Sequence, residues 1–166
     1  LDFDFDVFVC HASEDRGRVM PVVHEFERAG LRCWIAPRQI APWADYRAAI
    51  MRGLESSRSL LFVSSMHSLS SRHCLSEVDH AFDNRRTILT LRLDSTSFPK
   101  EFRYLIGNVQ WIDLVSAGAV PKLIAELGSR ESLRPRWQHL HRQAGRRVAA
   151  PIDAVRGFAE IIGLRG

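Results

Sequence analysis

Residues 3–35 read FDFDVFVCHASEDRGRVMPVVHEFERAGLRCWI. Residues 3–9 alternate and then become continuously apolar, which predicts a strand that enters a buried sheet. Ser13 suits a helix N-cap, and apolar residues recur at helical spacing until Gly30, which suits the position just after a helix. The apolar run 31–35 predicts a second strand. The stretch is therefore a strand–helix–strand unit, from which parallel sheets are built.

The same alternation continues along the chain. Further strands are predicted at residues 59–64, 87–93 and 109–113, and helices at 44–57, 72–83 and about 120–127, with a loop at 65–71 and an irregular segment or short helix at 99–108. Continuous apolar strands between helices predict an α/β fold: a five-stranded parallel sheet with helices on both faces. Because such sheets bind ligands at the carboxyl ends of their strands, we look for a site in residues 10–15, 36–46 and 65–73.

Composition excludes several classes of protein. The chain has 166 residues, 46% hydrophobic and 25% charged, which suits one folded domain with a modest appendage. It holds no apolar run of about 20 residues, as a membrane span requires. The three cysteines form no paired framework, so we expect reduced thiols in a cytoplasmic protein. The phosphate-binding motifs GxGxxG and GxxxxGK[ST] are absent.

The basic charge belongs to the C-terminal part of the chain. Residues 128–166 hold 8 Lys and Arg against 3 Asp and Glu, whereas the whole chain has a net charge of +4. No aromatic stacking pattern accompanies this charge, so a solvated helix face is favoured over a nucleic-acid footprint. We expect a domain at 1–130 and a basic helical extension or linker at 131–166.

Residues 72–80, RHCLSEVDH, hold the most informative polar side chains. The predicted apolar stripe of this helix consists of Leu75, Val78 and Phe82. Glu77 points away from that stripe, near the start of the helix and beside the carboxyl end of the third strand. Periodicity alone leaves three interpretations of Glu77: a surface carboxylate that stabilises the helix, a metal ligand together with His73 and His80, or a functional carboxylate.

Cys10 also has two interpretations. It directly precedes His11, an arrangement that suggests a thiol nucleophile. It also continues an apolar strand, which favours a small buried core residue.

Three motifs in order resemble those of Toll/interleukin-1 receptor (TIR) domains, particularly bacterial ones. Residues 6–15, DVFVCHASED, are similar to the first strand and loop of that family, and residues 26–40, FERAGLRCWIAPRQI, to its second strand and BB loop. Residues 59–64 followed by 70–77, SSRHCLSE, look like the third strand and the helix with the W-C-x-x-E signature. The resemblance covers about residues 3–127 and implies a flavodoxin-like TIR fold.

The resemblance implies an NAD glycohydrolase, since many members of the family cleave NAD at the nicotinamide–ribose bond. Glu77 occupies the position of the catalytic glutamate, and NAD is the substrate, so no cofactor is expected. The product, ADP-ribose or a cyclic form, stays open. The implied substrate-binding residues are His11, Ser13, Trp34, Arg38, Trp43, Tyr46 and His73. His73 is a departure, because it stands where the signature has Trp.

The expected partners follow from the same resemblance. Bacterial members act as antiviral immune effectors that self-associate through the BB loop, where Trp43 is a candidate anchor, and are commonly fused to a ligand-sensing domain. A non-catalytic TIR adaptor that works by oligomerisation is the alternative. A receiver-like module is disfavoured, because the third strand ends in Ser64-Ser65 rather than in a phosphoacceptor Asp.

Overall fold

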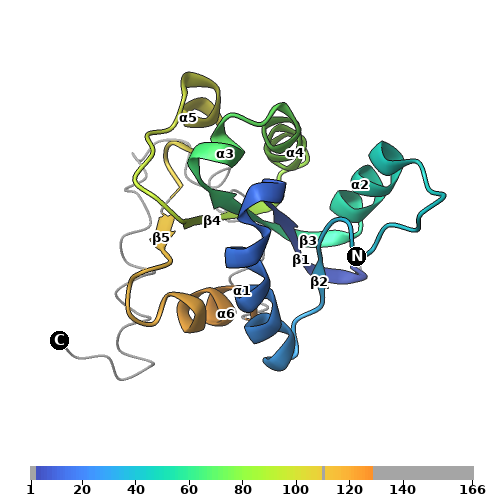
Figure 1. Ribbon diagram of the computed structural model, residues 1–166, viewed down its shortest axis with the longest axis horizontal. Coiled ribbons are helices and arrows are strands. Elements are labelled where there is room, and N and C mark those ends of the chain that lie inside the picture. Colours follow the sequence, from blue (N-terminus) through green and yellow to red (C-terminus); the bar gives the residue numbers. More distant parts are fainter. Residues whose placement is uncertain (1–2, 110, 129–166) are drawn as a thin grey trace, which may run out of the picture. The chain divides into compact units, whose positions relative to one another are not determined.

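The computed structural model describes residues 3–109 and 111–128, which form an α/β fold around one parallel sheet (Figure 1). The strands of the sheet are arranged in the order β2-β1-β3-β4-β5. They span Phe5–Cys10 (β1), Cys33–Trp34 (β2), Ser57–Ser64 (β3), Thr87–Arg92 (β4) and Trp111–Asp113 (β5). This order is that of the flavodoxin-like class, so the predicted fold class is confirmed.

Helices connect the strands. They span Arg16–Arg28 (α1), Tyr46–Glu55 (α2), Met66–Leu69 (α3), Arg72–Asp83 (α4), Lys100–Ile106 (α5) and Ala119–Gly128 (α6). Helix α4 has the predicted bounds, and Gly30 follows α1 with a φ of 87°, a left-handed conformation that glycine adopts without strain.

Two local predictions are wrong. Ser13 does not cap α1, because its hydroxyl donates a hydrogen bond to Glu14 and the residue begins a short 3-10 helix, Ser13–Asp15. The expected loop at 65–71 contains α3, whose first turn is closed by a reciprocal capping box between Ser65 and Ser68.

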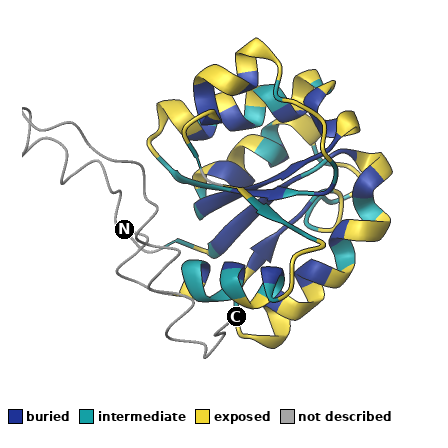
Figure 2. Ribbon diagram, turned by 90° about the vertical axis from the view of Figure 1, so that its left-hand side faces the viewer, coloured by how far each residue is buried: buried dark blue, intermediate teal, exposed yellow. Residues whose placement is uncertain are grey.

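The sheet has an apolar layer on each face, as Figure 2 shows by the buried strands between outward-exposed helices. Alternate residues of β1 divide between the layers: Val7 and Val9 pack with α1 and α6, whereas Phe8 and Cys10 pack with α2, α3, α4 and α5. Because the sheet is covered on both sides, the central parts of β1 and β3 are continuously apolar.

Trp34 of β2 lies within the second layer. Its ring is 4% exposed and stacks on Phe8, with the ring centroids 4.6 Å apart. Helix α2 passes so close that a Cβ added at Gly53 would lie 2.3 Å from the Trp34 ring. Gly53 therefore sets the approach of α2 to the sheet.

We predict that Gly53→Ala lowers the free energy of unfolding by about 1–3 kcal/mol, because the new methyl group overpacks a rigid aromatic ring. Urea unfolding measures the change. Gly17→Ala is the matched control: it lies in α1 with no atom near the added Cβ, so it should leave stability equal or raise it. Equal stabilities for the two variants would contradict this packing.

The expected extension at 131–166 lies outside the described residues, which end at residue 128. Within residues 3–109 and 111–128, the helices are too short or too polar to cross a membrane.

Candidate functional site

A pocket of about 830 Å³ opens at the carboxyl ends of β1 and β3. The chain leaves β1 toward α1 on one face of the sheet and leaves β3 toward α3 and α4 on the other. Such a switch point is where open parallel sheets bind ligands, and the volume is within the range of small-molecule sites. The pocket therefore lies where the sequence predicts a site, after the first three strands.

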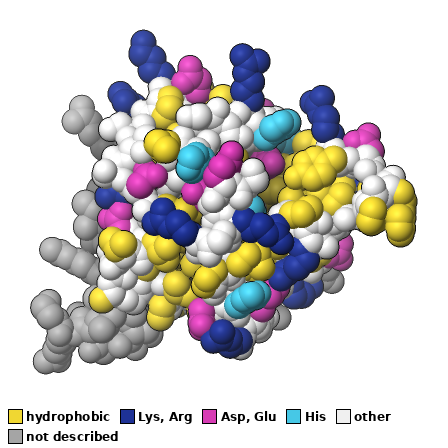
Figure 3. All heavy atoms as spheres, in the orientation of Figure 1, with side chains coloured by type: hydrophobic (Ala, Val, Ile, Leu, Met, Phe, Trp, Pro, Cys, Tyr) yellow, Lys and Arg dark blue, Asp and Glu magenta, His cyan; other side chains and the backbone are white. Residues whose placement is uncertain are grey.

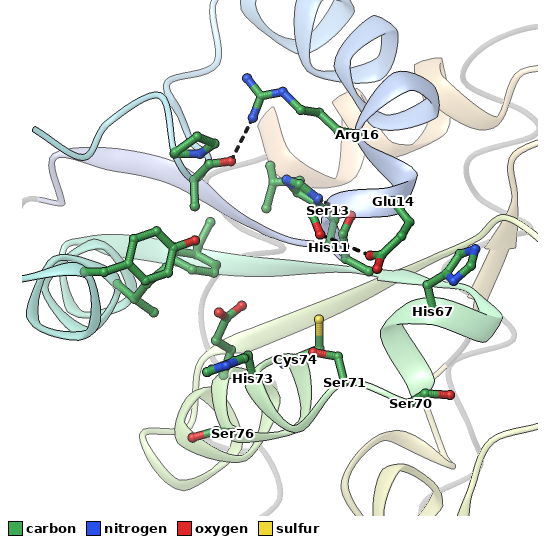
Figure 4. A pocket seen from close by; sticks show the side chains of 18 of the residues that line it. His11, Ser13, Glu14, Arg16, His67, Ser70, Ser71, His73, Cys74 and Ser76 are labelled. Carbon is green, nitrogen blue, oxygen red and sulfur yellow. Dashed lines mark hydrogen bonds between the residues drawn. The ribbon is translucent and has the colours of Figure 1, made fainter. Parts of the chain in front are cut away.

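Three segments form the walls of the pocket. Figure 4 shows His11, Ser13, Glu14 and Arg16 of the β1–α1 segment opposite side chains of α3 and α4. The α3 and α4 wall includes Met66, His67, Ser70, Ser71, His73, Cys74, Ser76 and Glu77, and the third wall includes Ala36, Pro37, Tyr46, Arg47, Ile50 and Met51. Residues that are far apart in the sequence thus meet at one opening.

A buried hydrogen bond ties two of these walls together. Ser65, directly after β3, donates its hydroxyl to the carboxylate of Asp15 at 2.5 Å, and both side chains are buried. The same Ser65 oxygen accepts hydrogen bonds from the backbone N–H groups of His67 and Ser68. Ser65 therefore holds the start of α1 against the start of α3.

We predict that Ser65→Ala costs about 2–3 kcal/mol of folding stability, because it removes a buried donor to a carboxylate and the cap of α3. Thermal or urea unfolding checks the value. Ser70→Ala, at the exposed end of α3, is the control and should change stability by less than about 0.5 kcal/mol. A Ser65→Ala protein as stable as the control would show that this bond does not brace the pocket.

Glu77 is not the exposed carboxylate that periodicity predicted. The buried residues of α4 are Cys74, Val78 and Ala81, whereas Phe82 is 42% exposed. The buried face is therefore rotated from the predicted stripe. Because Glu77 follows Cys74 by three residues, the two side chains are neighbours on this face. Glu77 is half-buried and lines the pocket.

Burial raises the pKa of Glu77 from 4.5 to about 7, and a hydrogen bond from the Cys10 thiol opposes this rise. A carboxylate removed from water without a cationic partner is shifted in this direction. Burial and the Glu77 charge together also raise the pKa of Tyr46, which faces the pocket from the first turn of α2. The site therefore holds a carboxyl group that titrates near neutrality, and such groups are typical of functional sites.

Cationic and titratable groups surround the opening of the pocket. Arg16 and Arg47 line it together with three histidines, His11, His67 and His73. Arg16 also donates a hydrogen bond to the Ala36 carbonyl at 3.2 Å, which connects α1 to the segment after β2 (Figure 4). Guanidinium groups at such a mouth suit a ligand that carries phosphates.

The two ring nitrogens of His11 differ in their surroundings. Its Nδ1 lies 2.7 Å from the Ala12 carbonyl, so Nδ1 carries the proton in the neutral ring and Nε2 is the acceptor. Nε2 is buried, and no described residue bonds to it.

The structure brings together five of the residues singled out in the sequence. His11, Ser13, Tyr46, His73 and Glu77 all line the pocket.

The other three expected substrate-binding residues lie elsewhere. Trp34 is packed in the core against Phe8, so its ring is not open to a ligand. Arg38 forms an ion pair with Glu27 of α1 and lies outside the pocket lining. Trp43 is 88% exposed in the turn before α2 and is absent from the lining. These three expected substrate-binding residues therefore do not line the pocket, although each lies close in the sequence to residues that do.

Two alternatives drawn from the sequence are also wrong. Among residues 3–109 and 111–128, no three His, Cys, Asp or Glu side chains are placed to hold a metal ion, so His73, Glu77 and His80 do not form such a site. Cys10 is fully buried, and burial raises its thiol pKa well above the ordinary value, which excludes a thiolate nucleophile. All three cysteines are buried and form no disulfide with one another.

Several pocket residues were missed in the sequence. Arg16, Arg47 and His67 lie in or beside the predicted loops, and their positions after the strand ends were the available signal. Their side-chain directions depend on how α1, α2 and α3 pack, which no local pattern reveals.

Three solved structures share this fold. The TIR domain of the Toll-related receptor TRR-2 from Hydra magnipapillata is 22% identical, with 84% of this chain and 97% of that chain covered and a TM-score of 0.59. The metazoan TIR-STING receptor from C. gigas is 16% identical, with 78% and 42% covered and a TM-score of 0.61. The TIR domains of the activated Roq1 resistosome are 13% identical, with 75% and 99% covered and a TM-score of 0.60. At these identities the likeness shows the fold alone.

The family follows from the sequence itself. A search of curated proteins finds no significant match. The family model of the TIR domain matches residues 7–127, which include every strand of the sheet apart from the first two residues of β1. This match covers most of the chain and all three walls of the pocket, and the chain therefore belongs to the TIR domain family.

Proposed function

We propose that this TIR domain cleaves NAD at the nicotinamide–ribose bond, with Glu77 as the catalytic carboxylate. The observation that carries the proposal is the position of Glu77. It is a half-buried carboxyl group with a pKa of about 7, enclosed in a pocket of about 830 Å³ at the switch point of the sheet. It occupies the position at which the family resemblance implies a catalytic glutamate.

The chemistry suits a single carboxylate. When the bond between C1′ and the pyridinium nitrogen breaks, its electron pair goes to nitrogen, and nicotinamide leaves as a neutral molecule. No general acid is needed, but positive charge develops on the ribose, as in glycoside hydrolysis. An ionised Glu77 beside the ribose stabilises that charge in a site of low polarity. Water then adds to C1′ and releases a proton, which gives ADP-ribose, or an internal nucleophile gives a cyclic product.

The remaining lining supports the rest of the substrate. Tyr46 offers an aromatic face to a base, and His73 takes the place of the larger signature Trp. Arg16 and Arg47 supply the positive charge that a diphosphate requires. His11 and Ser13 lie at the end of β1, on the wall opposite α4, where they can position the ribose.

Self-association is part of the proposal. Trp43 presents an 88% exposed indole in the turn before α2, and Figure 3 shows hydrophobic side chains gathered on the side of the molecule where Figure 1 draws α2. One of the structurally similar proteins is a resistosome. With the resemblance to bacterial effectors, these features support an immune effector that depletes NAD or makes a cyclic signal once its TIR domains meet.

Chromatography of NAD incubated with the purified protein tests the reaction. We expect nicotinamide together with equimolar ADP-ribose or a cyclic ADP-ribose. Intact NAD at high protein concentration, with the protein assembled, would contradict the enzymatic proposal and favour the adaptor alternative.

The pH dependence of the reaction gives a further prediction. Because Glu77 acts in its ionised form, kcat/KM should be constant above pH 7 and fall toward tenfold per pH unit below it. Initial rates between pH 5 and pH 9 measure the profile. Full activity maintained at pH 5 would show that the raised pKa of Glu77 plays no part in turnover.

A further inference from the structure

Cys10 is a buried residue near the proposed catalytic carboxylate and does not itself contact the substrate pocket. It ends β1, its side chain is fully buried, and it packs in the layer that contains α4. It does not line the pocket itself, although its chain neighbours Val9 and His11 do. Its thiol therefore lies in the core between the sheet and α4, and not in the open pocket.

The contact of Cys10 falls on the turn of α4 that carries Glu77. The Cys10 Sγ lies 3.9 Å from the carbonyl oxygen of Cys74, within reach of a thiol hydrogen bond. Cys74 and Glu77 are neighbours on one helix face, and interaction with the Cys10 thiol lowers the pKa of the Glu77 carboxyl group. A single buried thiol thus faces both a backbone carbonyl and the carboxyl group.

Only the protonated thiol of Cys10 can donate a hydrogen bond to either acceptor. Burial raises the pKa of Cys10 well above its usual value, and hydrogen bonding to Cys74 and the charge of Glu77 raise it further. A thiolate beside a carboxylate would place two like charges in a dry layer. Cys10 therefore stays a neutral donor across the physiological range.

We propose that Cys10 is a positioning residue for Glu77: its buried S–H donates to the ionised carboxylate and holds it directed into the pocket. This inference rests on the proposed function, because it assigns Cys10 a role in the same reaction. When Glu77 is protonated, the carboxyl group attracts the donor less, and the Cys74 carbonyl is the alternative acceptor. The Cys10 hydrogen bond therefore favours the charged form of Glu77 and opposes the effect of burial.

Other titratable and charged groups line the same pocket as Glu77. Tyr46 and Arg47 approach from α2, His67 from α3, and His73 and Cys74 from α4 itself. His11, Glu14 and Arg16 face the pocket from the β1–α1 segment. Cys10 differs from all of these because it does not line the pocket.

Cys10→Ala and Cys10→Ser test the inference by two readouts. The first is the pKa of Glu77 from NMR of ¹³C-labelled glutamate carboxyl groups, with Glu77→Gln used to assign the resonance. The second is the acid limb of NAD cleavage. Cys10→Ala should raise both by roughly half to one pH unit. Cys10→Ser keeps a donor, so both values should stay at or below those of the wild type.

Cys33→Ala is the matched control, since Cys33 is a buried cysteine in the opposite layer of the core. It should leave the titration of Glu77 unchanged. The inference is overturned if alanine and serine at position 10 shift the titration alike, or if Glu77 titrates in Cys10→Ala as in the wild type. If Cys10→Ala does not fold, a pKa of Glu77 that is higher in Cys10→Ser than in the wild type also overturns the inference. If the wild type cleaves no NAD, the proposed function fails, while the NMR titration still decides the contact.

Discussion

Glu77→Gln is expected to lower the rate of NAD cleavage by at least about 10²–10³-fold while the protein remains folded. Glutamine keeps the shape of the side chain but cannot carry the negative charge that faces the developing positive charge on the ribose. Loss of one well-placed electrostatic contact costs about this factor in other enzymes. Release of nicotinamide from NAD at pH 8 measures the effect.

The same substitution should raise stability at that pH. The carboxyl group of Glu77 has a pKa of about 7 in the folded protein, above the value of 4.5 for an unperturbed group. The folded state therefore binds a proton more tightly, so ionisation of Glu77 lowers stability progressively from about pH 4.5 to pH 7 and by a constant amount above that. Glutamine avoids this cost, which is up to about 3 kcal/mol.

Urea unfolding at pH 5 and pH 8 measures the effect of Glu77→Gln on stability separately from its effect on turnover. The gain in stability of Glu77→Gln over the wild type should be small at pH 5 and largest at pH 8. Asp79→Asn, on the exposed face of the same helix, is the control for removing a charge from α4 and should leave turnover unchanged. A Glu77→Gln protein with wild-type turnover would remove Glu77 from the reaction. Equal stabilities of Glu77→Gln and wild type at pH 8 would show that burial does not penalise its charge.

Trp43→Ala is expected to weaken self-association by roughly 10- to 30-fold, because exposed tryptophans are frequent anchors of interfaces. Its side chain is 88% exposed, so folding stability should change by less than about 0.5 kcal/mol. NAD turnover per molecule should fall at low protein concentration and recover in part as concentration rises. Light scattering and turnover, each measured over a concentration series, check both effects.

Val115→Ala is the matched control, since Val115 is an equally exposed apolar residue, at 89%, in the segment after β5. It should assemble and react like the wild type. Unchanged assembly in Trp43→Ala, or turnover per molecule that does not depend on concentration, would contradict a role for this loop in association.

Much of the fold follows from local patterns in the sequence. The apolar runs that became β1 and β3 are continuous because both faces of the sheet are covered. The start of α4 follows from Ser71, whose side chain accepts a hydrogen bond from the Cys74 N–H. The location of the pocket followed from the same pattern, since the carboxyl ends of parallel strands meet at one edge.

The burial of the site residues could not be predicted from the sequence. The buried face of α4 is set by packing against β1 and α5, so Glu77 turned out to be half-buried, although helical periodicity placed it on the exposed side. Trp34 lies in the core because Gly53 of α2 leaves room for its ring. Both outcomes depend on contacts between residues far apart in the sequence. The periodicity of a single segment gives no information about such contacts.

The most direct test of the account is a parallel assay of nicotinamide release by wild-type and Glu77→Gln protein at pH 8 and at a concentration at which both are shown by light scattering to assemble. The account predicts many turnovers of NAD per wild-type molecule and almost none by the folded, assembled variant. Assembled wild-type protein that releases no nicotinamide, or a variant that releases it at the wild-type rate, would contradict it.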